Sequence, residues 1–420
     1  MKKLLALFLF SWQACVSQTL PGLTLQTARE MALIHYPAIN KLELIRKESG
    51  FEMNGLNKEF LPHLNLAARA TYQSAVTELP FKIPSIRIPE MSKDQYNAAL
   101  SMGWLVYDGG YYKTQKELDK TMNRVQNQEI KITLDQLKDL VDNLFMDILY
   151  ERDYISITHL RIRDLASSLN QITALVGNGT MLPADADLIR AEMVETKQDL
   201  QSQQISCRGL LDMLGILMDS TLQNNIALIQ PVLDSITDSI SDIRPELGLY
   251  SAENNQLELE SQQIRSLYLP RVSLTGEGGY GRPGLNFLDN NFSFYYLAGV
   301  KLSMPVWDWR SGRNQRNILR LRQTMVKADK ATFEQGLSVQ LSKQYSEISR
   351  YRSMATSDNL LVQLRSQVEK TTASRLAHGA ATPHDYIEDL DAAELALQNQ
   401  QLHHLQFINA QLIYQEMLGH

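Results

Sequence analysis

Two short turns carry acidic residues at a repeated spacing in this chain of 420 residues. The second turn reads HGAATPHDYIED from His378 to Asp389, and the first reads GNGTMLPADADL from Gly177 to Leu188. Three landmarks of the first turn recur 200 positions later: Gly179 as Gly379, Pro183 as Pro383, and Asp185 as Asp385.

The carboxylates in these turns are suited to begin a helix. Thr382 fits the N-cap, Pro383 the first helical position and Asp385 the third, where its charge faces the positive end of the helix dipole. Such a carboxylate can serve as a cap alone, or it can also line a passage. The residues of the turn leave both possibilities open.

No pattern of an enzyme or a metal site accompanies these carboxylates. The chain contains no Gly-rich phosphate loop and no GxSxG, HExxH or CxxC sequence. His403 and His404 are adjacent, and neighbouring residues on a helix point apart, so they make a poor metal site. The sequence therefore predicts a protein that is not an enzyme and that uses no cofactor and no metal.

The N-terminus is typical of an exported protein. Residues 1–17 combine Lys2 and Lys3, an apolar stretch and small residues before Gln18, which indicates a signal peptide. An alternative is attachment of a lipid at Cys15. If Cys15 is removed with the signal peptide, Cys207 has no partner for a disulfide within the chain, and packing must stabilise the protein.

The composition restricts the partners. A net charge of −6 gives no basic surface for nucleic acid. After the signal peptide, no segment has 18 consecutive apolar residues, so transmembrane helices are not expected. An exported chain of this kind is either soluble in the periplasm or inserted in the outer membrane as β-strands.

The chain is predicted to be a tandem duplication. The sequence FLPHLNL, which begins at Phe60, returns as YLPRVSL at Tyr268, and VYDGG at Val106 returns as VWDWRSG at Val306. Landmarks in the same order at a nearly constant offset predict two copies of one structural unit. We expect a first repeat over residues 18–218, a linker over residues 219–243, and a second repeat over residues 244–420.

Each predicted repeat contains two strands. In the first repeat a helix over Thr24–Glu59 precedes a strand that begins at Pro62 and a second strand over Tyr96–Tyr107. Apolar and polar residues alternate in these strands, which is usual for a soluble sheet packed on a core. Their length of about 11–15 residues also suits tilted membrane strands. Four aromatic residues near the strand ends fit the membrane interface: Trp104, Tyr107, Trp307 and Trp309.

Each pair of strands precedes a very long helix. The 66 residues of Tyr111–Val176 contain no Gly or Pro, and their apolar residues follow a heptad pattern. Arg313–His378 is the equivalent segment of the second repeat. Taken alone, these helices would suit a periplasmic coiled-coil scaffold or adaptor with a small soluble β-domain. That alternative does not explain why each helix follows a pair of strands.

The number of strands requires oligomerisation if the strands cross a membrane. Four strands cannot close a barrel, and an open edge is not tolerated in lipid. Two chains would supply eight strands and a filled interior, whereas three would supply twelve strands and room for a passage.

With these features together, the mature chain resembles the TolC family of outer-membrane efflux proteins. Leu23–Ile39 is similar to the family's opening signature, LPHLNL and LPRVSL to its strand starts, and VYDGG and PVWDWRSG to its strand-to-helix junctions. The resemblance implies a mainly α fold: long coiled-coil helices form a periplasmic α-barrel, and four membrane strands per chain form a twelve-stranded β-barrel in a homotrimer. It also implies a location in outer-membrane lipid, with the helices extending into the periplasm of a Gram-negative cell.

The resemblance further implies a function and its sites. Such a channel is the exit duct of a tripartite efflux or type I secretion system, and it works with a periplasmic adaptor (membrane fusion) protein and an inner-membrane pump. Asp385, Glu388 and Asp185 would form the acidic gate of the pore. Some family members carry a basic residue near the gate, where this chain has Ala381, so no salt-bridge latch is expected there. The adaptor would contact the tips at Gly179, Thr180, Gly379 and Ala380.

Overall fold

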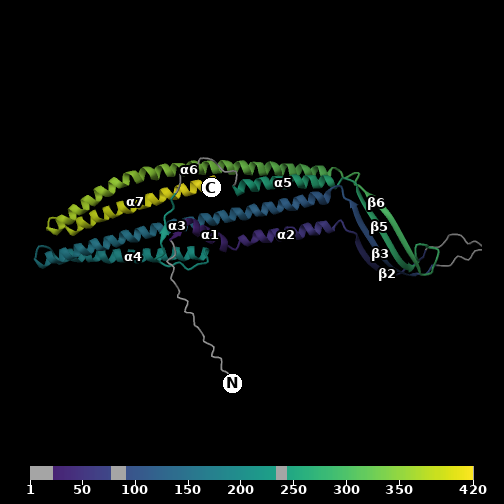
Figure 1. Ribbon diagram of the computed structural model, residues 1–420, viewed down its shortest axis with the longest axis horizontal. Helices are drawn as coiled ribbons and strands as arrows, with labels where there is room; N and C mark the ends of the chain where they lie inside the picture. The colour runs from purple at the N-terminus through teal and green to yellow at the C-terminus, as the bar shows by residue number, and fades with distance from the viewer. Residues whose placement is uncertain (1–21, 77–90, 233–243, 420) are drawn as a thin grey trace, which may run out of the picture. The chain divides into compact units, whose positions relative to one another are not determined.

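The structure is a computed structural model that describes residues 22–76, 91–232 and 244–419 (Figure 1). The predicted signal peptide, Cys15 and part of the predicted linker lie outside these residues. The chain divides into two compact units. We call Pro37–Thr133 with Ser241–Ser338 the sheet unit, and Met1–Tyr36 with Leu134–Ile240 and Val339–His420 the hairpin unit. Each unit draws on both predicted repeats, whose boundaries stay a prediction.

The sheet unit contains one antiparallel sheet of four strands in the order β2-β3-β5-β6. The strands are β2 (His63–Tyr72), β3 (Asp94–Tyr107), β5 (Arg271–Arg282) and β6 (Ser293–Ser303). Helix α2 (Ile39–Lys58) precedes the first pair of strands, and α5 (Pro245–Ser266) precedes the second pair. The two predicted strands of each repeat are therefore present, and the two pairs join through β3 and β5.

The prediction of a single helix over Thr24–Glu59 is wrong, because the structure has two helices there. The structure has α1 over Leu25–His35 and α2 over Ile39–Lys58, with a break between them. Tyr36 at the break is extended, with φ −70° and ψ 122°. The proline at position 37 disfavours the helical conformation of the residue before it and lacks the N–H that would continue the helix.

Two very long helices contribute residues to both units. Helix α3 spans Tyr111–Gly177 and α6 spans Ser311–Ala377, so each has 67 residues, and they begin 200 positions apart. Their return helices are α4 (Pro183–Leu217) and α7 (Pro383–Leu418). Both long helices were predicted to within two residues at each end. Among the described residues, no helix has the length and hydropathy needed to cross a membrane.

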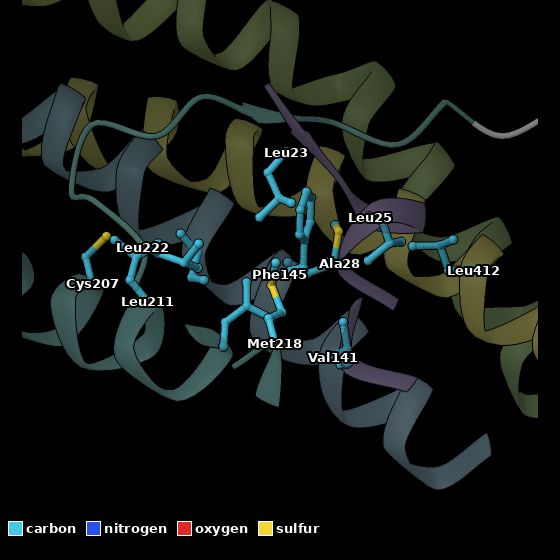
Figure 2. Packing of buried hydrophobic residues seen from close by; sticks show 14 of the residues in the cluster. Leu23, Leu25, Ala28, Val141, Phe145, Cys207, Leu211, Met218, Leu222 and Leu412 are labelled. Atoms are coloured by element: carbon cyan, nitrogen blue, oxygen red, sulfur yellow. The ribbon is translucent and has the colours of Figure 1, made fainter. Parts of the chain in front are cut away.

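The hairpin unit has an apolar core between α1, α3, α4 and α7 (Figure 2). Phe145 and Val141 of α3 are fully buried there, and Leu211 of α4 and Leu412 of α7 pack in the same cluster. Cys207 lies in this core as a free thiol. A short parallel pair of strands, β1 (Leu23–Thr24) and β4 (Leu228–Ile229), lies within the same unit. Packing of apolar side chains thus stabilises this unit, as the cysteine count predicts.

Candidate functional site

One face of the sheet is apolar across all four strands. The pairing register places Leu66 opposite Leu100, Leu100 opposite Gly278, and Gly278 opposite Tyr296. Because successive residues of a strand alternate between faces, the same register repeats at every second position. The apolar face is completed by these residues: Leu64, Ala68, Ala70, Tyr72, Tyr96, Ala98, Met102, Trp104, Val272, Leu274, Tyr280, Phe294, Ala298, Val300 and Leu302.

This apolar face is exposed. Leu66 is 79% exposed, Phe294 85% and Tyr296 84%. A soluble sheet of this kind normally covers such a face with a core, and a contiguous apolar surface marks a contact with lipid or with another protein. The prediction of alternating strands is confirmed, and the exposure favours lipid over an ordinary soluble core.

The opposite face is polar. Its side chains include Asn97 of β3 and Glu277 of β5, which are linked through the hydroxyl of Tyr295 of β6. Asn97 Nδ2 donates to Tyr295 Oη at 2.7 Å, and that hydroxyl donates to Glu277 Oε1 at 2.9 Å. Gly279 lies against the ring of Tyr295, where a Cβ would stand 2.6 Å from it. A sheet with one apolar and one polar face fits a wall between lipid and water.

Aromatic residues lie at both ends of the apolar face. At the end away from the helices, the ring of Tyr280 lies 4.5 Å from that of Phe294 and 5.5 Å from that of Phe292. At the helix end, Trp104 donates its indole N–H to the carbonyl of Phe60 at 2.8 Å, and Tyr107 ends β3 half-exposed. Two aromatic bands that flank an apolar band are typical of membrane strands.

The other two predicted interface aromatics lie between β6 and α6. Trp307 is 71% exposed and Trp309 is 84% exposed, and their rings meet edge to face with centroids 5.7 Å apart. Trp309 has a φ of 54°, in the left-handed region. All four predicted aromatics thus lie at the helix end of the sheet or in the loop that leaves it.

A pair of aspartates fixes the turn from strand to helix in both halves of the chain. Asp108 accepts the N–H groups of Gly110 at 2.8 Å and Tyr112 at 2.6 Å, at the start of α3. Asp308 accepts those of Arg310 at 2.9 Å and Gly312 at 2.8 Å, at the start of α6. The sequence predicts that VYDGG and VWDWRSG are repeated strand-to-helix junctions, and the capping role of their aspartates is a finding of the structure. The signal was an Asp directly before a helix.

The two tips have the same backbone. Gly179 and Gly379 have φ of 72° and 68°, a conformation that favours glycine. The N–H of Thr180 bonds the carbonyl of Leu175 at 2.9 Å, and that of Ala380 bonds the carbonyl of Arg375 at 2.7 Å. These contacts are Schellman motifs that end α3 and α6. The four residues predicted as adaptor contacts therefore form the exposed helix ends.

The acidic residues of the tips begin the return helices. Asp385 Oδ2 accepts the N–H of Thr382 at 3.0 Å, and Thr382 Oγ1 accepts the N–H of Asp385 at 3.2 Å. The backbone N–H of Thr382 lowers the pKa of Asp385, so this exposed carboxylate is charged at neutral pH. Asp185 accepts the N–H of Leu182 at 2.9 Å, but Leu182 has no hydroxyl to return the bond. The capping role predicted for Asp385 is confirmed.

Glu388 lies one turn further along α7 and is exposed. Asp385 and Glu388 are three positions apart, so they share one face of the helix. Buried residues beneath them join the two hairpins in a second apolar cluster, which contains Leu165 and Ile172 of α3 and the fully packed Tyr386 of α7. Burial raises the pKa of Tyr386 to about 12. A rigid core thus supports the two acidic side chains at the surface of the tip.

Arg161 joins three helices in the hairpin unit, and sequence analysis did not identify it. Arg161 of α3 pairs with Glu192 of α4 and with Asp391 and Glu394 of α7. Burial acts to lower the pKa of Arg161, but the three carboxylates outweigh it and raise it. Of the two glutamates that accept hydrogen bonds from Arg161, one lies 31 positions away in the chain and the other 233 positions away. No local sequence pattern therefore indicates the pairing.

A second arginine cluster places three carboxylates around one guanidinium. Arg29 of α1 bonds Asp142 of α3 and Glu416 of α7, and Asp139 lies beside them. Burial and the neighbouring Asp142 raise the pKa of Glu416 to about 9. One guanidinium cannot balance three carboxylates in a poorly solvated site, so we assign a proton to Glu416 at neutral pH. Among the described residues, no group of His, Cys, Asp and Glu has the arrangement of a metal site.

Comparison with known proteins gives matches at the level of structure. No family model matches the sequence, and a search of curated proteins finds no match. The outer membrane protein VceC of Vibrio cholerae matches with a TM-score of 0.73 and 14% identity, over 94% of this chain and 96% of that chain. CusC matches with a TM-score of 0.75 and 13% identity, over 94% and 91%. The CmeC outer membrane channel of Campylobacter jejuni matches with 0.72 and 14%, over 94% and 85%.

This chain has the fold of outer-membrane channel proteins. The channel fold confirms the expected fold class, which is mainly helical with long helices and four antiparallel strands. The matches extend over 94% of this chain, so the shared fold concerns its whole architecture.

Proposed function

We propose that three copies of this chain form an outer-membrane exit channel of a tripartite efflux or type I secretion system. The observation that carries the proposal is the exposed apolar face, in register across all four strands and bounded by aromatic residues. Lipid would cover this face, and the polar face would line the water-filled interior. The channel would pass small molecules or proteins to the exterior without chemical change.

The proposed trimer follows from the edges of the sheet. In the part of the chain that the structure describes, β2 and β6 each have one edge without a neighbouring strand. Unpaired backbone groups are not tolerated in lipid, so these edges must pair between copies. Three copies supply twelve strands, which close a barrel with a passage.

The long helices also have faces that a single copy leaves uncovered. On α6, Leu321, Met325 and Val339 are each more than 60% exposed, and Leu364 and Val368 are about half exposed. Apolar residues at such positions normally pack on another helix. Neighbouring copies would cover them and would build a helical tunnel in the periplasm, about 100 Å long if the 67-residue helices run straight.

The tips would be the periplasmic entrance. Threefold symmetry would turn Asp385 and Glu388, with Asp185 of the first tip, into rings of carboxylates that favour cations. The small residues Gly179, Thr180, Gly379 and Ala380 would leave space for a helical hairpin of a periplasmic adaptor. An inner-membrane pump would complete the system.

The gate is tested with Asp385→Asn and Glu388→Gln. Asparagine keeps an oxygen that can accept the N–H of Thr382, so the pair of changes removes charge while the cap is retained. In single-channel recordings we expect weaker block by divalent cations and a lower preference for cations than in the wild type. Asp187→Asn, at an exposed site that pairs with Arg190, removes one charge elsewhere in the tip and is the control. If the double variant conducts as the control does, the gate assignment is wrong.

The alternative function is a periplasmic scaffold or adaptor with a soluble β-domain. Fractionation separates the two functions, because a channel requires detergent for extraction from outer membranes and a scaffold is released in buffer. Recovery of the mature protein in the aqueous fraction would favour the scaffold.

A further inference from the structure

The first turns of α6 carry an excess of positive charge. The segment from Trp309 to Ala328 contains six basic residues and no Asp or Glu, in a chain whose net charge is −6. The basic residues are Arg310, Arg313, Arg316, Arg320, Arg322 and Lys327. Such a run is unusual for a purely structural helix face, because like charges at a spacing of four destabilise a helix.

Three of these arginines share one side of the helix. Arg313, Arg316 and Arg320, with Asn317, line a hollow of about 270 Å³. Among the residues that the structure describes, the hydrogen bonds of this arginine patch stay within its own helix: Arg316 Nε donates to the carbonyl of Gly312 at 3.3 Å, and Arg320 to Asn317 Oδ1 at 3.4 Å. Within the described ranges, no carboxylate forms an ion pair with any of the three. Their guanidinium groups therefore keep most of their donors available.

The first repeat has the same positions but not the same charge. Lys113, Lys116 and Lys120 lie 200 positions before the three arginines, but Glu117 and Asp119 stand among them. Lys120 pairs with Glu117 at 2.8 Å, and Lys116 Nζ donates to Asn57 Oδ1 at 2.5 Å. The surplus of free positive charge thus belongs to α6.

The arginine patch follows the last strand of the sheet closely along the chain. Strand β6 ends at Ser303 and α6 begins at Ser311, with the exposed Trp307 and Trp309 between them. The patch starts two residues into the helix and ends near residue 320, which is about 15 Å along the helix axis. Basic residues at this distance from a membrane surface are attracted by anionic lipids, and arginine pairs with phosphate through two donors at once.

We propose that the patch formed by Arg313, Arg316 and Arg320 binds the phosphate head groups of anionic phospholipids in the membrane leaflet that meets the helix end of the sheet. The inference rests on the proposed function, which places the apolar face of the sheet in lipid. The tryptophans would lie at the level of the head groups, and the arginines would hold the phosphates from the water side.

The test uses the full-length protein in mild detergent, with phosphatidylglycerol or phosphatidylcholine added. Native mass spectrometry counts retained lipids, and thermal unfolding measures stabilisation. We expect the wild type to retain phosphatidylglycerol in preference to phosphatidylcholine, and to lose that preference as salt is raised. Arg313→Gln, Arg316→Gln and Arg320→Gln together should lower the affinity for phosphatidylglycerol on the order of 100-fold, since each arginine contributes roughly five-fold.

The control removes the same charge from the same helix. Lys343→Gln, Arg352→Gln and Arg365→Gln change three exposed basic residues in the part of α6 that belongs to the hairpin unit, and this variant should bind as the wild type does. Three results would overturn the proposal. One is equal binding by the patch variant and the control, and another is stabilisation by inorganic phosphate as large as that by the lipid. The third is altered ion selectivity in neutral bilayers with lipid retention unchanged, which would place the patch in the passage.

The same native mass spectra distinguish a failure of this inference from a failure of the proposed function. A trimer that retains no phosphatidylglycerol would refute lipid binding alone. A monomer that is soluble without detergent would refute the channel.

Discussion

Glu416 is a partly buried carboxylic acid whose proton links stability to pH. The folded chain holds this proton up to a pKa of about 9, whereas an unfolded chain releases it near 4.5. The folded state therefore binds more protons between these values, and linkage requires its stability to fall as pH rises from about 5 toward 9. Arg29, Asp142 and Asp139 are the charged groups that face Glu416.

The prediction at this scale is that Glu416→Gln flattens the pH dependence. Glutamine resembles the protonated acid, so the variant should be nearly as stable as the wild type at pH 5 and more stable at pH 9. Thermal unfolding of the hairpin unit in the intact protein, followed by far-UV circular dichroism from pH 5 to 9, measures the difference. Gln400 on the same helix, whose side chain donates to the neutral amide of Asn359 at 2.7 Å, offers a comparison: Gln400→Ala should leave the pH slope unchanged. Parallel curves for wild type and Glu416→Gln would refute the assigned proton.

Residue roles could be predicted from the sequence only where the partners are local. Thr382, Pro383 and Asp385 have the cap positions expected from their order in the chain. The partners of Arg29 lie 113 and 387 positions away, so its cluster could not be found without the fold.

At the scale of the element, a lysine substitution should have opposite effects on membrane assembly at two neighbouring residues of β3, because they lie on opposite faces of the sheet. Leu100 lies on the apolar face of β3 and Ser101 on the polar face. A lysine in the middle of a lipid-facing strand costs about 2–4 kcal/mol, and a lysine that faces water costs little. We therefore expect Leu100→Lys to reduce the amount of folded protein in outer membranes strongly, and Ser101→Lys to assemble almost normally. Heat-modifiable mobility in gels and outer-membrane yield provide the readout.

An equal loss for both lysine variants would contradict the assignment of the faces. It would indicate that both sides of β3 are packed against protein, as in a soluble sandwich. A loss for Ser101→Lys alone would invert the faces.

Helices and strands were predicted well because their patterns are strong. The absence of Gly and Pro over 66 residues predicts α3, and alternation predicts the strands. The break between α1 and α2 was missed, because helix formers on both sides of the proline at position 37 hid its effect. Strands β3 and β5 are paired in the sheet although 163 residues separate them in the chain. No local sequence pattern specifies this pairing.

At the scale of the whole molecule, the duplicated sequence is folded into units that are not the repeats. Each compact unit combines segments of both halves, since the strands of both halves share one sheet and the hairpins of both halves share one core. The exposed apolar surfaces of the sheet and of α6 are left for other copies of the chain. Oligomerisation is thus the step on which the proposed function depends most.

The native mass of the protein extracted from outer membranes in mild detergent tests this step most directly. The account predicts a trimer, with three copies of a chain of at most 47.8 kDa, whose twelve strands close a conducting barrel. A monomer or dimer recovered in buffer without detergent would contradict it. The apolar face would then have to be covered by a different partner, and the scaffold would replace the channel as the function of this chain.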